Sequence, residues 1–277
     1  MVINISSLNL FRVAKKRTSN KFSILIPVFL LVLAGLIFRA YQEYKASKLI
    51  SLTRYTFINQ NSLISINIKD KTKIIINLPE DLYVETAYHY GQLRLKNVYA
   101  VGQLDRRGGK VLAGTVSDLL GVPVLENNFN YLDQLLIRFH EFNLRVDKIK
   151  KIEVQTDELV LADGSKALTV DQNKWDFLTA DVFNETDLVT ENLKIEILNA
   201  GTVTGLGNQA ARLLTRIGLD VVNVANQDIP IKDCEVKVVK PSKTAERIAG
   251  IFGCKIMAKE PGRADVSLIL RVLHPGE

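Results

Sequence analysis

The stretch NAGTVTGLG, residues 199–207, has the composition of a phosphate-binding turn. Asn199 opens it, and Gly201, Gly205 and Gly207 follow. The apolar run LKIEIL precedes the turn, and NQAARLLTRIG, whose apolar residues have helical spacing, comes after it. A glycine turn between a strand and a helix lets a pyrophosphate approach the helix N-terminus. Dinucleotide binding is therefore the first chemistry to weigh.

A dinucleotide site needs an acidic residue about 20 positions further on to hold the ribose. Asp228 falls past the end of the next apolar run, and Tyr41 with Lys45, spaced as Tyr-x-x-x-Lys, lies far upstream. We therefore expect no nucleotide here. The other interpretation is a structural turn, in which Gly201 permits a positive φ while Gly205 and Gly207 allow close packing of the helix on a sheet.

Other catalytic or metal-binding sets are missing from the sequence. His89, His140 and His274 are scattered without ligand spacing, and no C-x-x-C occurs, so we expect no metal site. Cys234 and Cys254 are the two cysteines. They could form a disulfide in an exported domain, or be two small buried hydrophobic residues, and their spacing leaves both open.

One element stands apart from the rest, the uncharged run FSILIPVFLLVLAGLIF at residues 22–38. As a helix it spans about 25 Å, and Lys21 and Arg39 can extend it by reaching outward with their charged groups. A core helix would show a polar stripe, and a cleaved signal peptide would be followed by a small-residue cleavage site. We therefore expect a retained, single-pass membrane anchor.

Charge sets the expected orientation of this anchor. The net charge is +6, and basic residues crowd the first 21 positions, where no acidic residue occurs. Basic residues favour the cytoplasmic side, so the N-terminus is expected inside and the body outside the cytoplasm. The rest of the chain is nearly balanced, which gives no case for nucleic-acid binding.

The middle of the chain is predicted to mix helices and strands. After a juxtamembrane helix that leads into a strand, SLISINIKDKTKIIINLP predicts a β-hairpin ended by Pro79. Helices are predicted at residues 93–103, 108–120 and 129–143, strands over 151–170, and a short helix over 173–183. The helix at 129–143 carries its apolar residues on one side: Tyr131, Leu132, Leu135, Leu136, Phe139 and Phe142.

The C-terminal region has the clearest pattern, β-α-β-β-α-β. Strands are predicted at LKIEIL, LDVVNVA, CEVKVV and ADVSLIL. One helix carries Leu206, Ala210, Leu213, Leu214 and Ile217 on a face, with Gly218 after it, and Ser242 caps the other.

These C-terminal segments resemble the LytR C-terminal domain of bacterial cell-envelope proteins. That domain has a strand ending in V-L-N-G-T, a glycine turn, a helix ending in a small residue and glycine, and a last strand A-D-V-x-V-x-L. The corresponding positions are Asn199, Gly201, Gly205, Leu206, Ala210, Gly218, Val222 and 264–266. Ala200 and Arg271 each replace a usual glycine. The resemblance implies an envelope location and no particular reaction.

The middle region, roughly residues 62–150, is similar to the LytR-CpsA-Psr domain, whose pattern includes I-P-R-D-T-Y-V and later K-I-N-A-A-Y-A. Matching positions are Pro79, Asp81, Tyr83, Val84, Tyr99 and Ala100. Members of that family move a lipid-pyrophosphate-linked glycopolymer to peptidoglycan, using Mg²⁺ on acidic residues and arginines on the pyrophosphate. Such phosphotransfer is mostly positioning and charge neutralisation, so its cations are essential.

This sequence departs from that pattern at the charged positions. Glu80 replaces the arginine of I-P-R-D, NQNSLI replaces an upstream R-x-D, and Lys96 replaces the asparagine of K-I-N, whose lysine matches Arg94. If the domain is active, the resemblance and nearby charges implicate Asp81, Arg94, Arg106 and Arg107, with Mg²⁺. Otherwise Arg106, Arg107 and Lys110 belong to a solvated loop. The charge reversal at Glu80 favours a non-catalytic member.

The sequence thus predicts an α/β (α+β) protein with an N-terminal membrane helix. The expected layout is a basic cytoplasmic tail (1–21), an anchor (22–38), a juxtamembrane segment (39–60), a degenerate LytR-CpsA-Psr-like domain (61–182), a polar linker (183–192) and a LytR C-terminal-like domain (193–272). The expected role is binding or structural, in the cell wall. The expected partners are the bilayer and peptidoglycan or another envelope protein. The alternative is a divergent phosphotransferase.

Overall fold

The structure is a computed structural model, and it describes residues 21–201, 203–227, 231, 233–260 and 262–271. The chain divides into two compact units, residues 1–46 and 47–277, which are described separately below. The predicted basic tail before Lys21, and the residues Asp228 and His274, lie outside the described residues.

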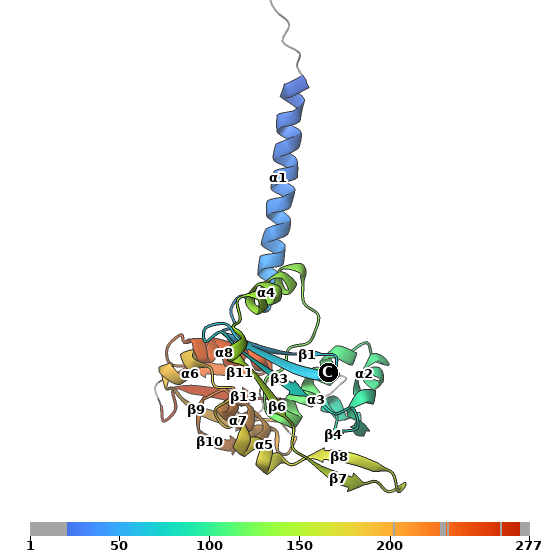
Figure 1. Cartoon of the computed structure of the whole chain (residues 1–277). Helices are drawn as coiled ribbons and strands as arrows, with labels where there is room; N and C mark the ends of the chain where they lie inside the picture. The colour runs from blue at the N-terminus through green and yellow to red at the C-terminus, as the bar shows by residue number, and fades with distance from the viewer. Residues whose placement is uncertain (1–20, 202, 228–230, 232, 261, 272–277) are drawn as a thin grey trace, which may run out of the picture. The chain divides into compact units, whose positions relative to one another are not determined.

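The first unit contains the helix α1 (Lys21–Ala46; Figure 1). Its segment Ile26–Ala46 is apolar and long enough to cross a membrane by length and composition. The helix extends beyond the predicted anchor into the predicted juxtamembrane segment. Its 26 residues correspond to about 39 Å.

The second unit begins with a four-stranded sheet in the order β1-β2-β3-β6. The predicted hairpin is confirmed as the antiparallel pair β2 and β3. Strand β1 pairs with β2 in antiparallel fashion, and β6 pairs with β3 in parallel. The strands are β1 (Arg54–Asn59), β2 (Ser62–Asn67), β3 (Thr72–Asn77) and β6 (Ile149–Glu153).

Successive side chains of these strands point to opposite faces of the sheet, and apolar residues occur on both faces. Helices therefore cover both faces, and each face has its own core. One core joins Leu63 and Ile76 to the helices α2 (Leu95–Gln103), α3 (Gly108–Leu120) and α5 (Gln172–Leu178), whose Trp175 is fully buried. The other core joins Tyr55 and Ile66 to α4 (Tyr131–Phe142). All four helices were predicted from the sequence.

Two small hairpins complete this part of the unit. Strands β4 (Tyr83–Glu85) and β5 (Gln92–Arg94) flank the short helix η1 (Ala87–His89). Strands β7 (Thr156–Val160) and β8 (Lys166–Val170) lie in the region predicted as strands, and between them Gly164 has φ +80°. The short helix η2 (Val146–Lys148) precedes β6.

The apolar side predicted for residues 129–143 faces solvent for the most part. In α4, Leu136 packs on the sheet, but Tyr131, Leu135, Phe139 and Phe142 are exposed. Periodicity located the apolar stripe correctly. It could not show that the opposite side of the helix, which carries Leu136 and Ile137, would pack on the sheet.

The C-terminal domain is a five-stranded sheet in the order β10-β9-β13-β11-β12. Only the pair β11 and β13 is antiparallel, and α7 and α8 bury their apolar faces in the core of this domain. Its elements are β9 (Lys194–Asn199), α7 (Leu206–Arg216), β10 (Asp220–Asn226), β11 (Glu235–Val238), α8 (Lys243–Phe252), β12 (Lys255–Ala258) and β13 (Val266–Leu270).

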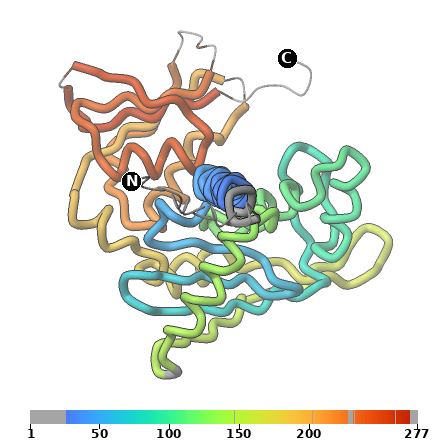
Figure 2. Tube along the Cα trace, turned by 90° about the horizontal axis from the view of Figure 1, so that it is seen from above, coloured from blue at the N-terminus to red at the C-terminus, as the bar shows by residue number. Residues whose placement is uncertain are grey.

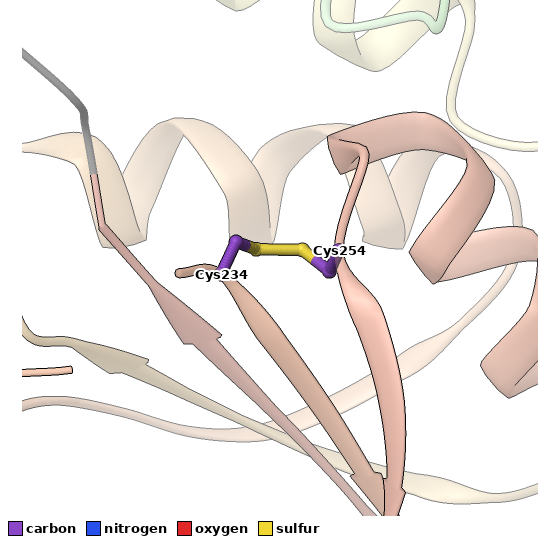
Figure 3. The surroundings of a disulfide bond; sticks show 2 residues. All are labelled: Cys234 and Cys254. Atoms are coloured by element: carbon purple, nitrogen blue, oxygen red, sulfur yellow. A yellow bond between two sulfur atoms is a disulfide. The ribbon is translucent and has the colours of Figure 1, made fainter. Parts of the chain in front are cut away.

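The predicted β-α-β-β-α-β order lacked one strand, the edge strand β12. Its sequence KIMA is short and all four residues are exposed, so it carries no alternating pattern. A disulfide joins Cys234, just before β11, to Cys254, just before β12 (Figure 3). The Cα atoms are 4.7 Å apart, which decides between the two interpretations of these cysteines.

The polar segment predicted as a linker, 183–192, packs against the cores of both neighbouring regions. It contains the helix α6 (Thr186–Glu191), and Phe183 and Leu188 are buried in the cores on either side of it. Figure 2 shows the C-terminal domain, in orange to red, beside the strands β1–β3, in blue to cyan. The polar composition reflects the charged side chains that meet here. The domain boundary itself stays a prediction.

Candidate functional site

The glycine turn is held together by the side chain of Asn199. Its amide Nδ2 donates to the carbonyl of Val203 at 3.0 Å, and its Oδ1 accepts from the backbone N–H of Gly201 at 3.1 Å. Asn199 is almost fully buried at the end of β9. An asparagine that bonds its own turn in this way closes the loop without any ligand.

Gly205 and Gly207 serve two different purposes. Gly205 has φ +86° with open space around the position of a Cβ, so it supplies left-handed backbone at the start of α7. At Gly207 a Cβ would lie 2.9 Å from Cγ1 of Val224 on β10, so this glycine provides the close helix–sheet packing. The positive φ expected for Gly201, next to the undescribed residue 202, stays a prediction.

The second candidate site centres on Asp81, just before β4. Its Oδ1 accepts from Nη1 of Arg94 and from Nζ of Lys96, both at 2.9 Å. The structure therefore brings together Asp81 and Arg94, two of the four candidates that the sequence named. Lys96 was noted as a departure from the family pattern, but its contact with Asp81 was not foreseen.

The remaining hydrogen bonds of Arg94 are made within the chain. Nη2 donates to the backbone carbonyl of Lys166 at 3.0 Å and to Oγ of Ser165 at 3.3 Å. Leu168 of β8 donates its N–H to the carbonyl of Asp81 at 3.1 Å. Asp81 and Arg94 thus hold the β7–β8 hairpin against β4 and β5. The sequence predicted strands in this region but gave no signal for their contact with Arg94, which lies 71 positions away from Ser165.

The two cations neutralise Asp81. Hydrogen bonds from Lys96 and then Arg94 lower the pKa of this exposed carboxyl below its ordinary value. A divalent cation would have to compete with both, and Mg²⁺ prefers oxygen ligands, several of them water. Among the described residues no group of three or more His, Cys, Asp and Glu side chains could hold a metal ion. In this arrangement both hydrogen bonds recorded at Oδ1 of Asp81 come from cations of the chain itself.

Glu80 lies beside this cluster and accepts a hydrogen bond from Nδ2 of Asn61. It borders a pocket of about 190 Å³, which Lys96, Tyr99 and Leu112 also line. Sites that enclose drug-sized ligands have volumes of about 300–1,000 Å³. This pocket is smaller, and its wall carries one carboxylate, Glu80, and one ammonium group, Lys96.

Arg106 and Arg107 belong to a different surface. They occupy the exposed turn between α2 and α3, and the charge of Arg107 acts on Tyr90. Tyr90 donates to Oδ2 of Asp105 at 2.6 Å, and that bond raises its pKa above the ordinary value despite the opposing effect of Arg107. The structure describes no ion pair between these arginines and Asp81.

This surface includes a backbone feature that the sequence did not reveal. Tyr88 and His89 both have left-handed φ, 63° and 62°, which non-glycine residues rarely adopt. The turn is held by the backbone N–H of Ala87, which donates to Oγ1 of Thr115 at 3.0 Å. Lys110 stands 5.3 Å from the centre of the Tyr88 ring. The strained turn therefore presents an exposed aromatic ring beside a cation.

Several solved structures are similar to parts of this chain, and no curated protein matches it. B. subtilis TagV is 10% identical with a TM-score of 0.37, over 45% of this chain and 93% of TagV. The LytR-CPS2A-psr family protein YwtF (TagT) with bound octaprenyl pyrophosphate lipid is 12% identical with a TM-score of 0.33, over 46% and 88%. An Enterococcus faecalis transcriptional regulator is 12% identical with a TM-score of 0.32, over 60% and 88%.

The model of the family described as "LytR cell envelope-related transcriptional attenuator" matches residues 192–272. This segment begins two residues before β9 and includes the glycine turn and the disulfide. The turn that resembled a phosphate site is thus a structural part of that domain. Residues 192–272 therefore match the model of the LytR cell envelope-related family, in agreement with the resemblance seen in the sequence.

Proposed function

We propose that the chain is a membrane-anchored cell-envelope protein whose middle domain binds a partner and catalyses no phosphotransfer. The observation that carries this proposal is the state of Asp81. Its carboxylate is already paired with Arg94 and Lys96, and Arg94 is further bonded to the β7–β8 hairpin. Phosphotransfer needs cations that are free to take up developing negative charge. Here those cations are held by the fold.

Membrane anchoring with the body outside the cytoplasm rests on two features. The segment Ile26–Ala46 has the length and apolarity of a membrane-spanning helix. The disulfide between Cys234 and Cys254 fits an oxidising compartment, because cytosolic thiols are kept reduced. Together they support an inside N-terminus and an extracytoplasmic body.

The partner that best fits the middle domain is peptidoglycan, with another envelope protein as the other candidate. Exposed aromatic rings bind sugars through their apolar faces, and nearby cations attract anionic groups. Tyr88 and Lys110 offer this combination on the strained turn, and the charge of Arg107 acts on Tyr90, two residues after Tyr88. We propose that this surface contacts the wall polymer.

Cosedimentation of the full chain in nanodiscs with peptidoglycan sacculi tests the binding role. The wild type should sediment with the sacculi, and Tyr88→Ala with Lys110→Ala should weaken that binding. Phe177→Ala removes an exposed aromatic ring from α5 and should leave binding unchanged. Equal binding by all three chains would exclude this surface. No binding by the wild type would favour a protein partner.

Titration with a short-chain polyprenyl pyrophosphate and Mg²⁺ tests the absence of a substrate site. The full chain in detergent should show no saturable, Mg²⁺-dependent binding. Saturable binding that Arg94→Ala abolishes would support the divergent phosphotransferase instead.

A further inference from the structure

An exposed apolar stripe runs along α4. Tyr131, Leu135, Phe139 and Phe142 are 73%, 52%, 61% and 87% exposed. Their spacing of four, four and three residues places them on one side of a helix. Arg138, which is also exposed, falls on the same side. Four large apolar side chains in one stripe are more than the scattered surface residues of an ordinary soluble domain.

The opposite side of α4 is firmly attached to the unit. Leu136 and Ile137 pack into the core under β1 and β2, and the hydroxyl of Tyr55 lies 3.1 Å from Nδ1 of His140. Lys73 on β3 forms an ion pair with Glu141 at 2.5 Å. The stripe is therefore the outer surface of a fixed helix and not a frayed segment.

The first turn of α4 is bound to the residues that directly follow the candidate membrane helix. The carboxylate of Asp133 is 1% exposed and accepts from Oγ of Ser47 at 2.5 Å and from the backbone N–H groups of Lys48 and Leu49 at 3.2 and 3.3 Å. Ser47 is the residue after Ala46, where α1 ends. The chain therefore leaves α1 within one residue of a contact to α4.

We propose that α4 lies in the membrane–water interface, with this stripe in the outer part of the bilayer into which α1 is inserted. The inference rests on the proposed anchor. Whatever angle α1 takes, covalent continuity keeps the start of α4 close to Ala46, which is eight residues, or about 12 Å of helix, beyond the predicted end of the anchor at Phe38. Because α4 is about 18 Å long, it can lie along that surface for its whole length.

The chemistry of the stripe suits a lipid surface. An interfacial helix needs aromatic and aliphatic side chains on one side, and basic residues near it attract anionic lipid headgroups. Tyrosine and phenylalanine supply the apolar side here, and Arg138 the charge. A pocket of about 450 Å³ adjoins α4, and Ile50, Leu52 and Leu136 are among the apolar residues that line it.

Tryptophan fluorescence in liposomes with brominated lipids tests the proposal, because bromine quenches only nearby rings. The chain has one tryptophan, the fully buried Trp175, which serves as an internal standard. Phe139→Trp adds a second ring on the stripe, and we expect its emission to lose intensity when brominated lipids replace ordinary ones. Phe177→Trp is the matched control, since Phe177 is 84% exposed on α5, at the far end of the unit from α4 (Figure 1).

Flotation of the same liposomes separates this proposal from the anchor on which it rests. A chain that fails to float with the lipid would refute the anchor. A chain that floats while Phe139→Trp is quenched no more than Phe177→Trp would overturn the docking of α4 and leave the anchor standing. Protection of Phe139→Trp by a second copy of the chain, without bromine quenching, would overturn it equally.

Discussion

Arg94 and Asp81 show how the neighbours of a residue decide what it does. The hydrogen bonds of Arg94 go to oxygens of the chain itself: Oδ1 of Asp81, Oγ of Ser165 and the carbonyl of Lys166. The glutamate at position 80 was visible in the sequence, and it raised the question of whether the cations of this region are available to a ligand. The bonds to the distant β7–β8 hairpin were not visible, because no local pattern links the two segments.

The roles of Asn199 and the glycines in the turn also depend on their neighbours in the structure. A strand, a glycine turn and a helix were predicted, and the absence of an acidic partner argued against a nucleotide. The structure adds the reason for each glycine, which the sequence could not separate. Gly205 provides a backbone conformation and Gly207 a close contact to Val224.

That difference gives a testable pair of substitutions. Gly207→Ala places a Cβ 2.9 Å from Val224 and should destabilise the chain by about 1–3 kcal/mol through overpacking. Gly205→Ala should cost about 1–2 kcal/mol through left-handed backbone. Denaturant unfolding in detergent measures both. Adding Val224→Ala should rescue Gly207→Ala and not Gly205→Ala; rescue of both, or of neither, would contradict these assignments.

At the scale of elements, the segment around α6 was predicted as a polar linker and instead contains a helix packed between two cores. The segment 183–192 has the polar composition of a linker, yet Glu185 is 1% exposed. Arg247 of α8 donates to its carboxylate at 2.7 Å, and Arg212 and Arg216 of α7 bind Asp176 of α5 in the same way. Composition alone cannot distinguish solvated charges from charges that pair across an interface. The edge strand β12 and the outward stripe of α4 were missed for the related reason that local pattern does not reveal the neighbouring element.

The buried ion pair between Glu185 and Arg247 should contribute to the free energy of unfolding of the chain. Arg247→Met leaves the carboxylate of Glu185 buried without its main partner and should destabilise the chain by about 3–5 kcal/mol. Combining it with Glu185→Leu removes the stranded charge and should restore much of that loss. Denaturant unfolding in detergent measures the effect. A double variant as unstable as Arg247→Met would show that the ion pair is not the source of the change.

At the scale of the whole molecule, the chain combines a helix long and apolar enough to cross a membrane, a segment at residues 192–272 that matches the LytR cell envelope-related family, and a middle region in which Asp81 pairs with two cations. The mixed α/β fold and the C-terminal family were predictable, because long apolar runs, alternating strands and the glycine turn are local signals. The function of the middle domain was less predictable, because it depends on whether particular cations are free.

Turnover is the most direct test of that central claim. Full-length chain in nanodiscs is mixed with Mg²⁺, peptidoglycan and a polyprenyl-pyrophosphate-linked glycan, and transfer of the glycan is followed over time. The account predicts the same background rate for the wild type, for Asp81→Ala and for a reaction without protein. Transfer by the wild type that Asp81→Ala abolishes would contradict it.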